Sequence, residues 1–199
     1  MRGSVGLVVT KAKSKADETR QALLTAFCDL YRENPLEKIT VQSVTRKAGY
    51  NRTTFYQYFL DIEDLLRQVE ESLLAYISQK RNSLSVDEQP HDLIEDLVTI
   101  YEERAVEVNA LLGPYGRVHF TEKLKKSLDL SVFHLGSMQD NKYQPYLLEF
   151  RLTSALNLFS LWLSRGQDLS VEELIGLVTK LYHYNPGFQE LAETKQSNK

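Results

Sequence analysis

The sequence has little cysteine and no long apolar run. Cys28 is the single cysteine among 199 residues, so no disulfide forms within the chain, and no CxxC or Cys/His pair has zinc-ligand spacing. No apolar run approaches the ~18 residues that a membrane span needs, and the VGLVV segment is too short for a signal-peptide core. We therefore expect a cytoplasmic protein without structural metal, in which Cys28 is a small core residue.

Charge is distributed unevenly along the chain. Residues 1–60 contain 10 Lys and Arg against 5 Asp and Glu, whereas residues 61–199 contain 14 against 22. The first part therefore carries a formal charge of +5 and the second part −8. A basic unit joined to an acidic body is typical of a polyanion-binding module, although a solvated basic face would give the same count.

Apolar residues recur at helical spacing in most of the chain, and no segment shows the sustained alternation of a strand. The fold class is therefore predicted to be all-α. The expected helices are listed with their approximate bounds: 17–34, 40–48, 51–59, 61–80, 93–112, 120–135, 146–163 and 171–184.

The segment TVQSVTRKAGYNRTTFYQYF has the pattern of two short helices joined by a tight turn. Thr40 is a good N-cap for the first of these helices, and Gly49 supplies the backbone freedom that ends it. Asn51 is placed to cap the second, whose Phe55 and Phe59 lie on one edge. This pattern predicts a helix-turn-helix, in which the second helix enters the DNA major groove. Two helices that merely pack on each other would show the same spacing, so ordinary helix packing is the alternative.

The second helix carries polar side chains opposite its phenylalanines. Thr53 and Gln57 face away from that edge, and an amide such as Gln57 suits adenine. Arg52 is placed to reach a guanine edge or a phosphate, while Tyr56 and Tyr58 are placed to contact phosphates. The residues predicted to bind DNA are Thr40, Lys47, Tyr50, Asn51, Arg52, Thr53, Tyr56, Gln57 and Tyr58.

A longer segment, ITVQSVTRKAGYNRTTFYQYFLDIEDLL, resembles the DNA-binding signature of the TetR family of bacterial transcriptional regulators. Two further segments, LLGPYGRVHFTEKL and LWLSRGQDLSVEELIGLV, are similar to parts of a Firmicutes-type subgroup. One position departs from the family pattern, because Ile62 stands where a lysine usually contacts a phosphate at the start of helix 4. We expect this change to weaken DNA binding and to lower its salt slope by roughly one unit.

The resemblance implies a homodimer formed by the last two helices. The sequence agrees, because the expected helix 146–163 is apolar around much of its circumference; a monomer with a thick core is the alternative. The residues that support the dimer are Leu148, Leu152, Leu156, Phe159, Trp162 and Leu163.

The resemblance also implies a ligand cavity in the acidic half of the chain. The GPYG segment reads as a turn between helices and not as a phosphate loop, because no strand precedes it. Few fixed cations accompany the candidate lining residues, so we expect a neutral or weakly polar inducer. These residues are Tyr101, Tyr115, His119, Phe120, Phe133, His134, Phe150 and Trp162.

Three functions are candidates for this sequence. The first is a homodimeric repressor that binds a palindromic operator and is released by a small molecule. The second is a TetR-like regulator or co-regulator that answers to a protein partner and has no inducer. The third is a helical enzyme, which no nucleophile–base pair, metal cluster or cofactor loop supports.

The expected organisation follows from these assignments. It comprises a flexible basic arm (1–14), a helix-turn-helix DNA-binding domain (15–60), a connecting helix (61–80), a helical regulatory and dimerisation domain (81–185) and a frayed tail (186–199).

Overall fold

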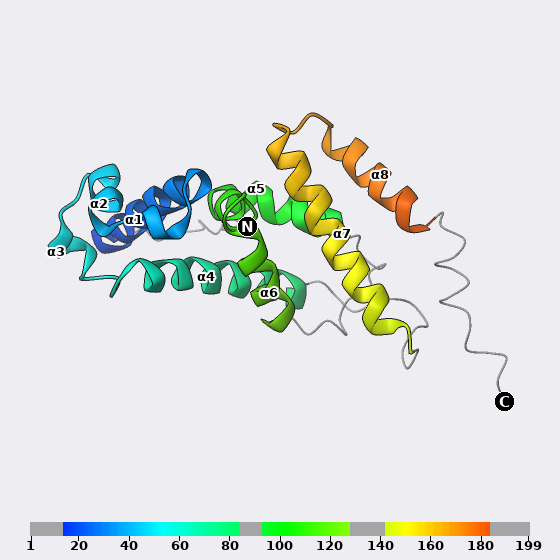
Figure 1. Cartoon of the computed structure of the whole chain (residues 1–199), viewed down its shortest axis with the longest axis horizontal. Helices are drawn as coiled ribbons and strands as arrows, with labels where there is room; N and C mark the ends of the chain where they lie inside the picture. The colour runs from blue at the N-terminus through cyan, green and yellow to red at the C-terminus, as the bar shows by residue number, and fades with distance from the viewer. Residues whose placement is uncertain (1–13, 84–92, 128–141, 184–199) are drawn as a thin grey trace, which may run out of the picture.

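The computed structural model describes residues 14–83, 93–127 and 142–183, which form eight α-helices and one short 3-10 helix, with no strand among them (Figure 1). The predicted all-α fold is confirmed. The elements are α1 (Lys15–Glu33), η1 (Leu36–Lys38), α2 (Val41–Ala48), α3 (Arg52–Phe55), α4 (Ile62–Ser83), α5 (Leu93–Leu111), α6 (Arg117–Ser127), α7 (Gln144–Ser164) and α8 (Val171–His183).

The helices are arranged along an elongated molecule. In Figure 1, α1, α2 and α3 lie at one end, α5 and α6 lie in the middle, and α7 and α8 lie at the other end, while α4 runs from beside α3 to α6. The buried apolar residues nevertheless form one continuous cluster from Leu23 in α1 to Val178 in α8. Helix α1 packs on α5 as well as on α2. The domain boundaries given above therefore stay predictions.

Side-chain caps begin the helices of the N-terminal group. Ser14 caps α1, and its hydroxyl and the Asp17 carboxylate form a capping box. Thr40 caps α2 in the same way with Ser43. Helix α2 ends at Gly49, whose φ of 77° is in the left-handed region that glycine adopts without strain. These local interactions explain why α1 and α2 begin and end close to their predicted bounds. Helix α3 instead ends at Phe55, four residues before the predicted end of that helix.

Cys28 lies in the core between these helices with 2% of its surface exposed. Burial raises the pKa of its thiol, with a further contribution from the Glu107 charge. The thiol is therefore protonated at neutral pH, which agrees with the expected packing role.

Two features of the body were not predicted. Helix α5 is interrupted at Arg104, where φ is −132° and ψ is 35°, and the Arg104 guanidinium donates to Ser72 Oγ at 2.9 Å. Helix α6 begins at Arg117, three residues before the expected start, and ends at Ser127 within the described residues. In those same residues, no helix combines the length and apolar character needed to cross a membrane.

Candidate nucleic-acid interface

The helix-turn-helix rests on a small aromatic base. Phe55 and Phe59 are almost completely buried, with ring centroids 5.4 Å apart, and Val44 of α2 is fully buried beside them. Helix α3 itself is only one turn long, but the Phe59 amide still donates to the Phe55 carbonyl at 3.0 Å. The predicted apolar edge is therefore present, and it orients the rest of this turn toward solvent.

The side chains opposite this edge are exposed. Thr53 of α3 and Gln57, in the turn that follows α3, are both exposed, as predicted. Arg52 is also exposed, and its Nη2 donates to Gln42 Oε1 of α2 at 3.1 Å. Gln42 was not among the predicted site residues. Its amide oxygen orients the Arg52 guanidinium across the two helices, a contact that neither helix pattern reveals alone.

The three predicted tyrosines occupy different environments. Tyr56 is 59% exposed, and its ring meets Phe55 edge-on with centroids 5.5 Å apart. Tyr58 is half-buried and packs against the core. The hydroxyls of Tyr50 and Thr19 lie 3.4 Å apart, between the turn and α1. Each ring thus contacts protein, and Tyr56 offers the most surface to an external partner.

Thr40 and Asn51 use side-chain oxygens to begin helices. Thr40 Oγ1 accepts from the Ser43 amide at 3.1 Å. Asn51 Oδ1 accepts from the Thr54 amide at 2.8 Å. Both side chains are exposed at helix N-termini, where backbone amides favour an anion. Their position fits the predicted phosphate contacts, while their hydrogen bonds show a structural role.

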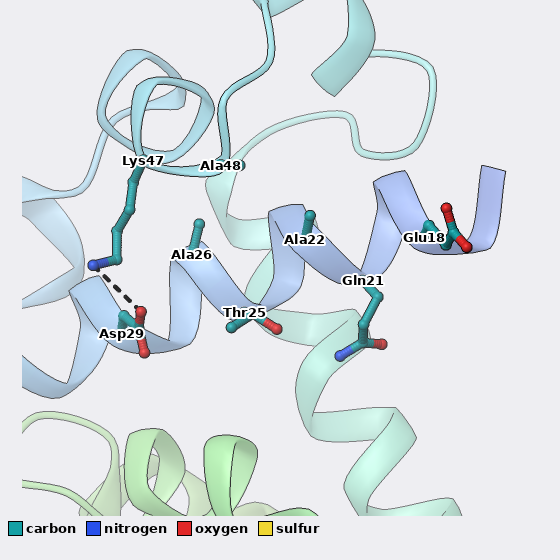
Figure 2. Close-up of a pocket in the computed structure, with 8 residues that line it drawn as sticks. All are labelled: Glu18, Gln21, Ala22, Thr25, Ala26, Asp29, Lys47 and Ala48. Atoms are coloured by element: carbon teal, nitrogen blue, oxygen red, sulfur yellow. Dashed lines mark ion pairs between the residues drawn. The ribbon is translucent and has the colours of Figure 1, made fainter. Parts of the chain in front are cut away.

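Lys47 points toward α1. Its ammonium forms an ion pair with Asp29 at 3.3 Å, drawn in Figure 2. The pair lies in a groove of about 550 Å³ between α1 and α2. The groove is lined by Glu18, Gln21, Ala22, Thr25, Ala26, Asp29, Lys47 and Ala48. Two carboxylates in this lining disfavour a phosphate, so a DNA contact by Lys47 would compete with its ion pair.

The start of α4 is tied to the recognition turn by Asp64, which the sequence interpretation did not include. Its side chain is 8% exposed, and Oδ2 accepts from the Leu60 amide at 3.0 Å. Gln68 Nε2 donates to the same oxygen at 3.1 Å and lies 3.3 Å from the Tyr58 carbonyl. The pKa of Asp64 is lower than its ordinary value. The hydrogen bond from the Leu60 amide contributes most, and the side-chain hydrogen bonds from Arg67 and Gln68 contribute less.

Ile62, at the position usually taken by lysine, is 7% exposed and belongs to the core. The preceding Asp61 accepts from the Asp64 amide at 2.7 Å and begins α4, as predicted. An apolar contact thus replaces the cation at this corner, while Leu60 next to it is 79% exposed.

The aromatic residues predicted to line a ligand cavity are only partly brought together. Tyr101 and Trp162 meet with ring centroids 6.2 Å apart, and Phe159 packs against both. Phe120 is buried, whereas Tyr115 and Phe150 are about half exposed. Phe133 and His134 lie outside the described residues. The cavity prediction for this set remains untested.

His119, also predicted to line the cavity, lies against Glu70 of α4. Its Nδ1 lies 2.8 Å from Glu70 Oε1, and Lys123 Nζ lies 2.7 Å from Glu70 Oε2. The Glu70 side chain is only 2% exposed. The sequence analysis did not predict this cluster. An acidic residue among apolar ones was its only sign, because Glu70 lies between Val69 and Leu73 on the apolar side of α4.

Four of the six apolar residues that supported the dimer prediction are buried within the chain itself, and Leu163 is half-buried. Leu152, Leu156, Phe159 and Trp162 are all buried in its own core. The structure does not describe the side chain of Leu148. The apolar residues of α7 and α8 that do face outward are Tyr146, Phe150, Leu161, Leu177 and Leu181.

Comparison with known proteins supports this description of the N-terminal helices. Residues 23–69 match the family of bacterial regulatory proteins named tetR. A solved structure described as the fatty acid degradation regulator FadR from Bacillus halodurans superimposes with a TM-score of 0.57 and 14% identity, covering 94% of this chain and 100% of that one. A search of curated sequences found no match. Residues 23–69 thus match the tetR family over the helix-turn-helix, and a helical body follows them.

Proposed function

We propose that this protein is a TetR-family transcriptional regulator that binds a palindromic operator as a homodimer and releases it when a small molecule binds. The observation that carries the proposal is the exposed polar side of α3 above a buried aromatic base. Thr53 and Gln57 face outward while Phe55 and Phe59 are buried. This segment lies within the residues that match the tetR family.

In the proposed complex, α3 enters the major groove and Gln57 reads a base edge. Arg52, oriented by Gln42, reaches a guanine or a phosphate near the helix N-terminus. Tyr56 and the N-terminus of α2 contact phosphates and hold the register without reading sequence. Repression follows if the operator overlaps a promoter.

The dimer places two such units on one operator. The exposed apolar side chains of α7 and α8 support it, because Tyr146, Phe150 and Leu161 lie on one side of α7 at spacings of four and eleven residues. Leu177 and Leu181 repeat this pattern on α8. Exposed apolar side chains on two neighbouring helices are available for an interaction surface, and a two-fold dimer requires half-sites separated by about one helical turn or a multiple of it.

The signal is proposed to travel through α4. Its first turn is bound to the recognition turn by Asp64, and its middle is bound to α6 by Glu70. A ligand releases DNA only if it favours an arrangement that binds DNA less well, and typical couplings change affinity by about 5–150-fold.

Control by a protein partner is the second candidate. One observation favours it: the rings of Tyr101, Phe159 and Trp162 pack on one another. None of the three lines either of the two described cavities. Such packing leaves less room for an inducer among the residues predicted to bind one.

Selection of the full-length protein on randomised duplex DNA tests the proposal. We expect enrichment of an inverted repeat, together with a dimer in sedimentation equilibrium at micromolar concentration. Leu177→Glu should weaken the dimer, whereas Lys180→Glu, an exposed change on the same helix, should not. Absence of any enriched sequence would reject operator binding, and a monomer that selects a single half-site would reject the dimer.

A further inference from the structure

A second cavity lies between the end of α1, the turn before α6 and the last turns of α7. Its volume is about 500 Å³, within the usual range of small-molecule sites. None of the aromatic residues predicted from the sequence lines it. The lining residues are Arg32, Glu33, Asn109, Leu112, Gly113, Pro114, Arg117, Ser160, Leu161, Leu163 and Ser164.

The charged residues of this lining favour a monoanion. Arg32 and Arg117 supply two guanidinium groups, and Glu33 is the one acid of the set. Arg32 is close to Glu33 at 3.4 Å, but both side chains are more than half exposed, so this ion pair is weak. Arg117 Nη1 donates to the neutral Asn157 Oδ1 at 3.2 Å. Within the described part of the chain, no carboxylate forms an ion pair with Arg117.

Ser160 adds a polar group that lacks a partner. The residue is 8% exposed, and its hydroxyl has no hydrogen bond within residues 14–83, 93–127 and 142–183. The other described serines of α7 differ, because Ser154 and Ser164 donate to the Phe150 and Leu161 carbonyls. A buried hydroxyl without a partner is destabilising, and rotation of Ser160 toward a bound oxygen would relieve that cost.

The turn that forms one wall is held in place before any ligand binds. A side chain at Gly113 would put its Cβ 2.6 Å from the Asn109 carbonyl oxygen, and one at Gly116 would come within 2.8 Å of two carbonyls of α5. Tyr31 of α1 donates its hydroxyl to the Tyr115 carbonyl at 3.3 Å. A wall fixed in this way lowers the cost of ordering a site on binding.

We propose that this cavity binds an organic monocarboxylate with a compact apolar body. The carboxylate lies between Arg32 and Arg117, whose planar guanidinium groups suit two carboxylate oxygens. The apolar body packs on Leu112, Pro114 and Leu163. This charge differs from the neutral or weakly polar inducer expected from the sequence. The inference concerns binding alone, so it stands or falls independently of operator binding.

Titration calorimetry on the full-length protein at pH 7 tests the proposal, because it needs no DNA and keeps any dimer intact. The probe is 4-phenylbutyrate, which has one carboxylate and an apolar body. Its matched controls are 4-phenylbutylamine, which reverses the charge, and acetate, which lacks the body. We expect 4-phenylbutyrate to bind and both controls to bind at least tenfold more weakly.

Variants locate the bound probe. Arg117→Gln should weaken binding of 4-phenylbutyrate by roughly tenfold or more, and Arg117→Lys should restore part of the loss. Ser160→Leu should block the cavity, and the milder Ser160→Ala keeps the test usable if that variant does not fold. Arg165→Gln is the control, because Arg165 lies just beyond Ser164 in sequence and does not line the cavity. Helical circular dichroism verifies the fold of each variant.

Three outcomes would overturn the proposal. The first is no heat of binding with 4-phenylbutyrate. The second is binding of the amine as strong as that of the acid. The third is unchanged binding to folded Arg117→Gln and Ser160→Ala, which would place the probe elsewhere.

Discussion

The N-terminal helices and the body hold their polar groups by different means. Around α3, several hydrogen-bond partners are close in sequence. Asn51 Oδ1 caps α3 by accepting from the Thr54 amide, and Asp64 Oδ2 accepts from the Leu60 amide. In the body, Glu70 of α4 meets His119 and Lys123 of α6, which lie 49 and 53 residues away in the chain. The caps around α3 are therefore set by local chemistry, although Tyr50 and Lys47 also reach Thr19 and Asp29 of α1. The Glu70 cluster of the body depends wholly on how distant helices are brought together.

The two regions are therefore vulnerable to different kinds of substitution. A change at the recognition end removes a cap or a contact that its own segment defines, so the consequence can be assigned to one side chain. A change in the body leaves a distant partner buried without its counterpart. The predictions below test this contrast, starting with the largest expected effect.

Phe55→Ala should destabilise the protein most. Phe55 is fully buried and contacts Phe59 and Tyr56, and removal of such a side chain typically costs about 3–5 kcal/mol. Urea denaturation followed by circular dichroism measures the free energy of unfolding. Tyr56→Ala is the control, because Tyr56 is 59% exposed and its removal leaves no comparable cavity. An equal loss of unfolding free energy in the two variants would contradict the role of Phe55 as a buried base.

Lys123→Met should be the most costly charge removal in the body. Glu70 would keep only His119 as a partner while its side chain stays buried, and a buried group deprived of a hydrogen bond costs about 1–3 kcal/mol. Lys126→Met, an exposed change on the same helix, should have little effect.

A double-mutant cycle with Glu70→Gln distinguishes this ion pair from general helix effects. We expect the two changes to be less damaging together than the sum of the single changes. Strict additivity would show that Lys123 does not stabilise the fold through Glu70.

Gln57→Ala should lower affinity for the selected operator by about 1–3 kcal/mol and relax preference at one base position. Tyr56→Phe should weaken binding to all sequences by a similar factor, because a phosphate contact carries no sequence information. Fluorescence anisotropy on a panel of single-base operator variants separates these two effects. An unchanged base preference in Gln57→Ala would show that Gln57 does not read a base.

The smallest effect concerns acid pH. The pKa of Asp64 is lower in the folded protein than its ordinary value, so ionised Asp64 stabilises the fold above the unfolded pKa of about 3.9. That stability is lost as the pH falls from there through the folded pKa.

Asp64→Asn should therefore be less stable than the parent protein at pH 7, and the difference should shrink toward pH 3. Denaturation curves at a series of pH values measure this difference. Glu63→Gln, an exposed change in the same turn, should show no comparable trend. A difference that stays constant with pH would rule out the role of the Asp64 charge.

The sequence alone determined the all-α fold, the helix-turn-helix and most of its exposed face. Helical spacing, the caps Thr40 and Asn51 and the left-handed Gly49 act over a few residues, so a linear pattern contains their physical cause. The exposure of Thr53 and Gln57 follows from the same spacing once Phe55 and Phe59 are buried.

Only the tertiary structure decided which polar groups meet across helices and which apolar residues stay outside. Leu152 and Leu156 of α7 lie in the core, whereas Leu161 of the same helix is exposed. The leucines of α7 are spread around much of its circumference, so the sequence does not say which side its neighbours cover. The Glu70 cluster and the cavity beside Arg117 likewise combine groups from separate helices. Their physical cause is the packing of α4, α6 and α7 in space, which no local pattern contains.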